Sequence, residues 1–194
     1  MRIAGGRGRM AVDVLLSALA KEEPAAFAHA REVADLATAV AESLGLDRRG
    51  RENVARAAEL HDIGKMAIPG EILAKRGPLD ASEHELMRRH TLVGEAMICA
   101  APTLRPIALL VRASHERWDG RGYPDGIEGE AIPLGARIVA VCDAFSAMCE
   151  ARPYGNRLTE AEALAELRRC SGTQFDPRVV HAFCATRGAL PVAV

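Results

Sequence analysis

The sequence is poor in aromatic residues and has no excess of charge of one sign. Only 4% of its 194 residues are Phe, Trp or Tyr, and the formal net charge is −1. Without a basic block, the chain lacks the electrostatic footprint of a protein that binds a nucleic acid polymer. Hydrophobic residues make up 49% of the chain, enough for one domain with a buried core. Because alanine, leucine and valine dominate, this composition favours a packed helical protein.

Paired cysteine motifs and long hydrophobic runs are also missing. The five cysteines, at positions 99, 142, 149, 170 and 184, form no CxxC motif, so we expect reduced thiols. The start of the chain looks like a secretory signal, but Asp13 interrupts its short apolar run. Four apolar residues there instead follow a helical spacing: Val12, Leu15, Leu16 and Leu19. Since no run is long enough to span a membrane, we expect a cytoplasmic protein.

Apolar residues recur with a helical period along nearly the whole chain. We expect a short amphipathic helix near the start and further helices over residues 24–44, 51–62, 82–97, 104–112, 136–151, 159–169 and 176–187. Ser82 and Glu85 have the spacing of a capping box, and residues 126–133 leave room for a short hairpin. The pattern predicts an all-α bundle, with a lead and helix in 1–23, the main domain in 24–187 and a tail in 188–194.

Several ionisable residues lie on predicted helix faces that are otherwise apolar, namely His29, His61, His90 and Asp143. Any one such histidine is more often a hydrogen-bonded core residue than a ligand. A buried carboxylate without a partner, however, costs several kcal/mol. One metal centre with nitrogen and oxygen ligands, which also takes up Asp62 and His115, can satisfy all of these groups together.

The adjacent pair His61 and Asp62 suits such a centre, because the imidazole can hold one ion while the carboxylate bridges to a second. Two ions about 3.5–4 Å apart can clamp a phosphodiester and deprotonate the attacking water. The remaining histidines, His84 and His181, lie outside this pattern, and we expect both to be solvated.

A series of motifs runs from about Leu16 to Phe183. In order, they are HDIGK at 61–65, IPGEILAKRGPLD at 68–80, RRHTLVG at 88–94, HERWDGRGYPDG at 115–126, IPLGARIVAVCDAF at 132–145, RPY at 152–154 and GTQFDP at 172–177. The series resembles the HD superfamily of metal-dependent phosphohydrolases and, within it, the HD-GYP family of cyclic di-GMP phosphodiesterases. An isolated HD pair carries no weight, but this order and spacing are specific.

The resemblance implies a helical bundle with the metal site between core helices, and a role for each matching residue. Two divalent ions, iron or manganese with magnesium also open, would be held by His29, His61, Asp62, His90, His115 and Asp143. Asp62 would bridge the ions, and Lys65 would reach a substrate phosphate. Tyr123 and Arg152 would line the substrate groove. The alternatives are that Lys65 is a solvated cation at a helix end and Arg152 a charge at a helix C-terminus. We expect Trp118 to anchor the loop by packing.

The chain departs from the family pattern at four positions. Ser114 replaces the first of two consecutive histidines, which argues against a third metal. Ala25 stands where some members have a glutamate ligand. Ser146 and Gly155 stand where an aspartate and a lysine are common.

The implied function is hydrolysis of cyclic di-GMP to pGpG, with further cleavage to GMP left open. A signalling module without turnover is the main alternative, and it would bind cyclic di-GMP or a diguanylate cyclase (GGDEF) partner through the GYP loop. A phosphohydrolase for another nucleotide is a third reading, which the intact GYP triplet argues against. A homodimer through the N-terminal helix is left open. About two dozen residues precede the core, too few for a sensory domain, so we expect a stand-alone output domain or a trimmed chain.

Overall fold

Helices form the architecture of the residues that the computed structural model describes, 4–150 and 157–188. The long helices are α1 (Ala4–Glu22), α2 (Pro24–Ser43), α3 (Arg48–Leu60) and α8 (Leu134–Cys149). The shorter ones are α4 (Gly70–Leu73), α5 (Ala81–Arg88), α6 (His90–Cys99), α7 (Arg105–Arg112), α9 (Glu160–Arg169) and α10 (Pro177–Thr186). Three 3-10 turns complete the set: η1 (Ile63–Ala67), η2 (Pro102–Leu104) and η3 (Gly129–Ala131). This confirms the predicted all-α class.

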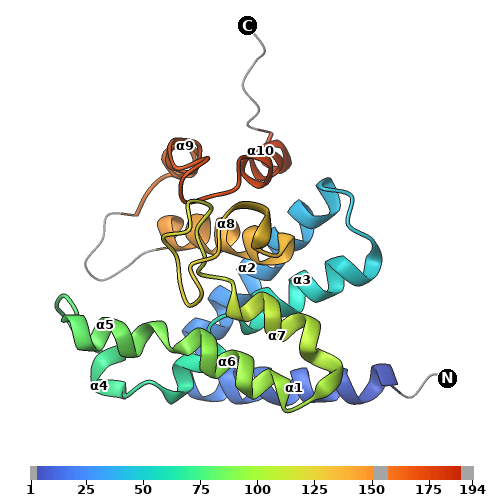
Figure 1. Ribbon diagram of the computed structural model, residues 1–194, viewed down its shortest axis with the longest axis vertical. Helices are drawn as coiled ribbons and strands as arrows, with labels where there is room; N and C mark the ends of the chain where they lie inside the picture. Colours follow the sequence, from blue (N-terminus) through green and yellow to red (C-terminus); the bar gives the residue numbers. More distant parts are fainter. Residues whose placement is uncertain (1–3, 151–156, 189–194) are drawn as a thin grey trace, which may run out of the picture.

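Helix α2 is the centre of the bundle. It packs against α1, α3, α8 and α10, and α7 packs against α3, α6 and α8. In Figure 1, α1 and α6 lie along the lower edge, while α9 and α10 lie above α8. Small residues such as Ala37 and Ala58, both fully buried, let these helices approach closely. The six predicted metal ligands come from this central group of helices and from the turns beside it.

The expected capping box and the hairpin considered for the loop are both wrong. The capping box of α5 is formed by Asp80 and Glu83 rather than by Ser82 and Glu85. Asp80 follows the Gly77–Pro78 break, and its carboxylate accepts from the Ser82 and Glu83 amides, each at 2.9 Å. The hairpin considered for residues 126–133 does not form, since the described residues contain no strand and η3 occupies that segment.

The single helix expected over 82–97 is two helices, α5 and α6, separated at Arg89. Two side chains compete for backbone carbonyls at this point: the His90 ring bonds to the Met87 carbonyl, and the Thr91 hydroxyl donates to the Arg88 carbonyl. Such local side-chain bonds compete with the regular helix ladder. The break places His90 at the first turn of α6.

The other predicted helices form close to their expected bounds. Helix α1 is longer than the short helix expected, and α3 begins three residues early because the Asp47 carboxylate caps it through the Gly50 amide at 2.7 Å. Both His84 and His181 are exposed, as predicted. Arg152 and Gly155 lie outside the described residues, as does the tail from residue 189.

Candidate metal centre

The six residues expected to hold metal come together at the middle of the bundle. They form two groups whose ligand atoms lie within 4.8 Å of one another: His29, His61 and Asp143 in the first, and Asp62, His90 and His115 in the second. Helices α2 and α8 supply His29 and Asp143, and the end of α3 supplies the His61–Asp62 pair. His90 begins α6, and His115 lies in the turn after α7.

Asp143 joins the first group. Its Oδ1 atom lies 3.0 Å from Nε2 of His29 and 3.6 Å from Nε2 of His61. His61 is almost fully buried, whereas Asp143 retains a quarter of its side-chain exposure. This carboxylate therefore has one side against the two histidines and another side open to a ligand.

Asp62 lies between the two groups. Its Oδ2 atom is 3.4 Å from Nε2 of His61, while its Oδ1 atom is 3.4 Å from Nε2 of His90 and 3.9 Å from Nε2 of His115. Each oxygen of one carboxylate thus faces a different group. A carboxylate in this position can bridge two ions.

Hydrogen bonds to neighbouring groups hold three of the imidazoles with Nε2 toward the centre. Nδ1 of His61 bonds to the Ala58 carbonyl, and Nδ1 of His90 bonds to the Met87 carbonyl, both at 2.7 Å. Nδ1 of His29 lies 3.2 Å from the Ser146 hydroxyl. Such partners fix which ring nitrogen faces a metal. The sequence reading treated Ser146 only as a departure from the family pattern and missed this contact.

The inner atoms of the centre lack ordinary partners. Among the described residues, Nε2 of His61, His90 and His115 and Oδ1 of Asp62 are buried without a hydrogen bond. Buried polar atoms normally have partners, and an unmet one indicates an ion or water. Because three nitrogens and a carboxylate oxygen converge here, the donor set fits a divalent ion. The two groups can hold metal ions.

The pKa shifts describe a site that attracts positive charge. Burial lowers the pKa of His90 to about 4, so its imidazole is neutral and its Nε2 lone pair is free to bind. Burial also disfavours charge on His61, but the carboxylates of Asp62 and Asp143 outweigh it and raise its pKa well above the usual range. Against its own burial, Asp62 has its pKa held well below the usual range by His61 and His115. A divalent ion bound beside His61 would neutralise the same two carboxylates, Asp62 and Asp143, that favour a proton on its ring.

Two of the residues expected to contact substrate lie directly against the candidate metal ligands. Nζ of Lys65 lies 2.6 Å from Oδ2 of Asp62, at the edge of the centre. The ring of Tyr123 stacks on His115, with 5.2 Å between centroids and 13° between planes, and the Arg88 guanidinium lies over the Tyr123 ring. One face of the Tyr123 ring is therefore covered by His115, a contact that the sequence did not predict. Arg152, the third expected contact, lies outside the described residues.

Two grooves open beside the centre. One, of about 720 Å³, includes Asp62 and Lys65 and runs along the junction of α1 and α2. The other, of about 300 Å³, includes His115, Tyr123 and Asp143. The centre thus lies between two spaces, each of which touches at least one of its carboxylates.

Ser114 and Ala25 take no part in the centre. The Ser114 hydroxyl is buried and donates to the Val111 carbonyl at 2.8 Å, which ends α7. Ala25 is an exposed alanine in the first turn of α2. Neither residue belongs to the two groups of possible ligands.

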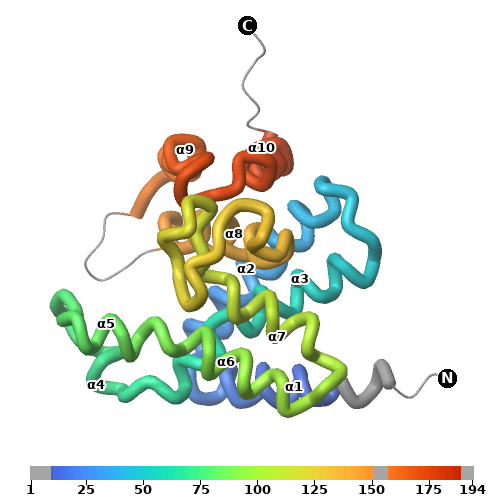
Figure 2. Tube along the Cα trace, in the orientation of Figure 1, coloured from blue at the N-terminus to red at the C-terminus, as the bar shows by residue number. Residues whose placement is uncertain are grey.

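The loop between α7 and α8 has its own internal supports, which sequence reasoning missed. Buried Glu116 accepts from the Asp125 and Gly126 amides at 2.7 and 3.1 Å. A Cβ added to Gly122 would lie 2.4 Å from the Arg117 nitrogen, so the first residue of the GYP triplet has room only for hydrogen. Figure 2 shows the loop, in yellow, folded over α8.

Trp118 anchors the far side of this loop. Its amide donates to the Gln174 carbonyl at 3.1 Å, its carbonyl accepts from the Gly129 amide at 3.0 Å, and the Arg137 guanidinium lies over its ring. The loop is therefore tied to α8 and to the segment before α10, as expected for a packing anchor.

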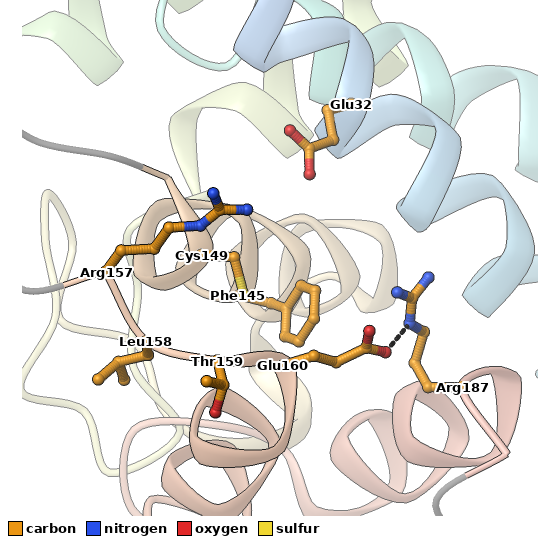
Figure 3. A pocket seen from close by; sticks show the side chains of 8 residues that line it. All are labelled: Glu32, Phe145, Cys149, Arg157, Leu158, Thr159, Glu160 and Arg187. Atoms are coloured by element: carbon orange, nitrogen blue, oxygen red, sulfur yellow. Dashed lines mark hydrogen bonds and ion pairs between the residues drawn. The ribbon is translucent and has the colours of Figure 1, made fainter.

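A further cavity, of about 400 Å³, is lined by residues of α2, α8 and α9 and by Arg187 at the end of α10. In Figure 3, Glu32 points into it from α2, Phe145 and Cys149 come from α8, and Arg187 pairs with Glu160. Glu32 follows His29 by one helical turn, so this cavity borders a ligand-bearing helix without touching a ligand atom.

Comparison with known proteins shows the family of the chain. The family model for the HD domain matches residues 13–179. The chain belongs to the HD-domain family. Relatives named as cyclic di-GMP phosphodiesterases, together with the GYP triplet, confirm the HD-GYP resemblance.

Two curated relatives illustrate how far the similarity extends. The cyclic di-GMP phosphodiesterase response regulator RpfG of Xanthomonas campestris pv. campestris is 41% identical over 186 residues, covering 95% of this chain and 49% of the relative. A cyclic di-GMP phosphodiesterase of Thermotoga maritima is 41% identical over 157 residues, covering 80% of this chain and 43% of the relative. The chain thus spans about half the length of these relatives.

Solved structures agree on the fold. An HDG"Y"P protein from Bdellovibrio bacteriovorus superposes with a TM-score of 0.71 at 17% identity, covering 95% of this chain and 63% of that one. A cyclic GMP-AMP-specific phosphodiesterase of V. cholerae gives 0.67 at 19% identity, covering 82% of this chain and 44% of that one. Among the residues described for this chain, no helix has the length and apolar character of a membrane span.

Proposed function

We propose that the chain is a metal-dependent phosphodiesterase that hydrolyses cyclic di-GMP to pGpG. The observation that carries this proposal is Asp62, whose two oxygens face two separate groups of ligands, 3.4 Å from His61 on one side and 3.4 Å from His90 on the other. Relatives of the same family, 41% identical, are named for this activity. Whether pGpG is cleaved further to GMP is left to the product analysis below.

The six clustered residues would hold two divalent ions, iron or manganese, with magnesium as the weaker fit to a histidine-rich site. When bound, the ions supply positive charge to the phosphoryl oxygens and generate a nucleophile from water at neutral pH. His29, His61 and Asp143 would form one site, and His90 and His115 the other, with Asp62 shared.

The chain's own residues add positioning and charge. Lys65 keeps its ammonium at the mouth of the larger groove beside Asp62, where it would donate to a phosphate oxygen and stabilise charge that develops in the transition state. Burial raises the pKa of Tyr123 to about 12, so its hydroxyl remains a neutral donor at physiological pH. Stacking of Tyr123 on His115 would hold that ligand in place. Arg152 remains a predicted phosphate contact.

A module without turnover is not favoured, because each of the six ligand positions is filled by a competent side chain and the relatives carry the names of enzymes. From the composition we infer a cytoplasmic protein. A GGDEF partner at the GYP loop, a homodimer through the N-terminal helix and the division into 1–23, 24–187 and 188–194 stay predictions.

The test combines metal content with turnover. Protein purified without a chelator or a metal-affinity tag is expected to contain about two metal ions per chain, and to convert cyclic di-GMP to pGpG in the presence of Mn²⁺ or Fe²⁺. Asp62→Ala should lose both turnover and bound metal, while Asp35→Ala, an exposed carboxylate on α2, should keep both. Full turnover in Asp62→Ala, or none in the metal-loaded natural chain, would overturn the proposal.

A further inference from the structure

The larger groove has two ends of different chemical character. At one end are Asp62 and Lys65 of the candidate centre, and at the other is the short junction where α1 meets α2. Its volume of about 720 Å³ is in the range of small-molecule sites. It is lined by Ala18, Leu19, Glu22, Glu23, Ala26, Asp62, Lys65, Met66, Ile68, Gly70 and Leu73.

Between these ends the walls are apolar. Leu19 and Ile68 line the groove but are largely buried. Met66 and Leu73 also line it and are 41% and 40% exposed. Apolar side chains that remain exposed beside a binding centre favour a planar, weakly hydrated ligand group. A nucleobase has this character, and a bare phosphate or metal ion does not.

At the junction end the groove is lined by two carboxylates, those of Glu22 and Glu23, while the nearby cation Lys21 is not among the described residues that line it. Glu22 lies 4.0 Å from Lys21, and both side chains are largely exposed, a geometry that binds weakly. Glu23 is the N-cap residue of α2, yet its side chain makes no capping bond. No ion pair or hydrogen bond holds the Glu23 carboxylate among the described residues, so it can accept two hydrogen bonds from a ligand.

Guanine and adenine differ in what they offer such a carboxylate. The Watson–Crick edge of guanine presents two adjacent donors, N1–H and N2–H, whereas adenine presents an acceptor at N1 beside its N6 donor. A carboxylate has acceptor oxygens only and pairs bidentately with two parallel donors. It therefore favours guanine and repels the adenine N1 lone pair.

We propose that Glu23, with Glu22 beside it, reads the guanine base of the nucleotide whose phosphate lies at Lys65. The inference rests on the proposed function and deepens it, since it assigns base selectivity to the α1–α2 junction. The apolar walls would take the faces of the base, and the carboxylate its donor edge. Residues outside the metal centre would thus set the choice between cyclic dinucleotides.

The experiment compares kcat/KM for cyclic di-GMP, cyclic di-AMP and bis(p-nitrophenyl) phosphate, which carries no base, on Mn²⁺-loaded full chain. For Glu23→Gln and for Glu22→Gln/Glu23→Gln, the ratio of the cyclic di-GMP value to the bis(p-nitrophenyl) phosphate value should fall at least about tenfold, as expected for partly exposed charge-assisted bonds. The preference over cyclic di-AMP should narrow by a similar factor. Glu71→Gln, an exposed carboxylate of α4 that does not line the groove, is the matched control and should leave both ratios unchanged.

The outcomes separate this inference from the proposed function. If the natural chain hydrolyses cyclic di-GMP and the double variant keeps both ratios, guanine is not read here and the inference fails alone. Equal losses on all three substrates would also overturn it, because they indicate a structural effect. If the natural chain hydrolyses no cyclic dinucleotide, calorimetry with Mn²⁺ and cyclic di-GMP decides: weaker binding in Glu23→Gln sustains guanine recognition, and equal binding rejects it.

Discussion

At the scale of single residues, the imidazoles of the centre have different supports behind them. His61 and His90 each bond through Nδ1 to the carbonyl three residues earlier in the chain. For His29, Nδ1 lies 3.2 Å from the Ser146 hydroxyl, its hydrogen-bond partner, and 3.7 Å from Oε2 of Glu150. A carbonyl persists in any variant, but a hydroxyl can be removed. A substitution at Ser146 therefore tests whether a hydrogen bond behind His29 affects metal binding, and it changes none of the candidate ligands.

We predict that Ser146→Ala weakens Mn²⁺ binding by about tenfold, the lower end of the range for lost outer-shell partners. The physical reason is that the His29 ring loses the contact that orients its Nε2 atom. Calorimetric titration of chelator-treated protein measures the affinity. Ser17→Ala removes a hydroxyl bond to a carbonyl on exposed α1 and should bind as the natural chain does, whereas unchanged affinity in Ser146→Ala would show that the contact does not orient the ring.

Gly64 in the HDIGK motif is the second informative residue. A Cβ at this position would lie 1.9 Å from the His90 carbonyl oxygen and 2.7 Å from the Gly94 nitrogen, both backbone atoms. The turn that carries His61 and Asp62 is thus pressed directly against α6. Since backbone cannot rotate away as a side chain can, the position excludes every other residue.

Gly64→Ala should lower the free energy of unfolding by about 3 kcal/mol or more, at the upper end of overpacking costs. Urea denaturation of the two proteins gives the difference. The control is Gly70→Ala, where a Cβ meets nothing within 4 Å and the change should stay within about 0.5 kcal/mol. Equal stability of both variants would mean that η1 moves away from α6 at little cost.

At the scale of elements, the loop between α7 and α8 is built from paired charges rather than from a large apolar core. Arg117 holds Asp119 through two bonds of 2.9 and 2.7 Å, and Arg112 holds Asp125 in the same way at 2.7 Å each. This loop carries His115 and Tyr123, so its charge pairs position part of the centre. Its order should therefore depend on pH in a way that apolar packing does not.

The pair with Arg117 lowers the pKa of Asp119 from 3.8 to about 2. A carboxyl with a lowered folded pKa contributes stability above pH 4, and that contribution disappears as the pH falls from about 4 to about 2. Asp119→Asn should therefore have a lower urea midpoint than the natural chain at pH 6, with the difference shrinking below pH 4. Asp35→Asn, exposed on α2, is expected to show no such trend, and a constant difference for Asp119→Asn would rule out the ion pair as its cause.

The helices could be predicted from the sequence because apolar periodicity is a local property, and the clustering of the six candidate ligands followed from polar residues on predicted apolar faces and from the family motifs. The break at Arg89 could not, since it depends on His90 and Thr91 bonding to carbonyls that a periodic pattern assigns to the helix. The N-cap of α5 is Asp80 rather than Ser82. Residue spacing alone does not decide between the two, because it does not show the direction in which the chain enters the helix after Gly77 and Pro78. Ser146 looked like a lost aspartate, and only its position beside His29 gives it a role.

At the scale of the whole molecule, α8 connects the centre to the C-terminal helices. Arg137 on α8 pairs with Asp176 at 2.5 Å, and their side chains are 10% and 0% exposed. Asp176 also caps α10 by accepting from the Arg178 amide at 2.8 Å. The same guanidinium lies over Trp118. One buried ion pair thus joins α8, α10 and the anchor of the loop.

Removing one member of a buried pair leaves the other charge uncompensated, which costs about 3–5 kcal/mol. We predict this loss of unfolding free energy for Asp176→Ala. Asp47→Ala serves as control, because Asp47 is an exposed N-cap of α3 and its loss should cost only about 1 kcal/mol. Thermal and urea unfolding both measure the change in unfolding free energy. Equal changes in the two variants would show that Asp176 stabilises the fold only as the cap of α10.

The six candidate ligands range from residue 29 to residue 143, and this spread has a thermodynamic consequence. Ions bound at such a centre recognise only the folded chain, because the unfolded chain does not bring these residues together. By mass action, an ion at a hundred times its dissociation constant adds about 2.7 kcal/mol to folding. The supply of metal would then determine how long the protein persists, because a chain without metal would be lost sooner through unfolding and proteolysis.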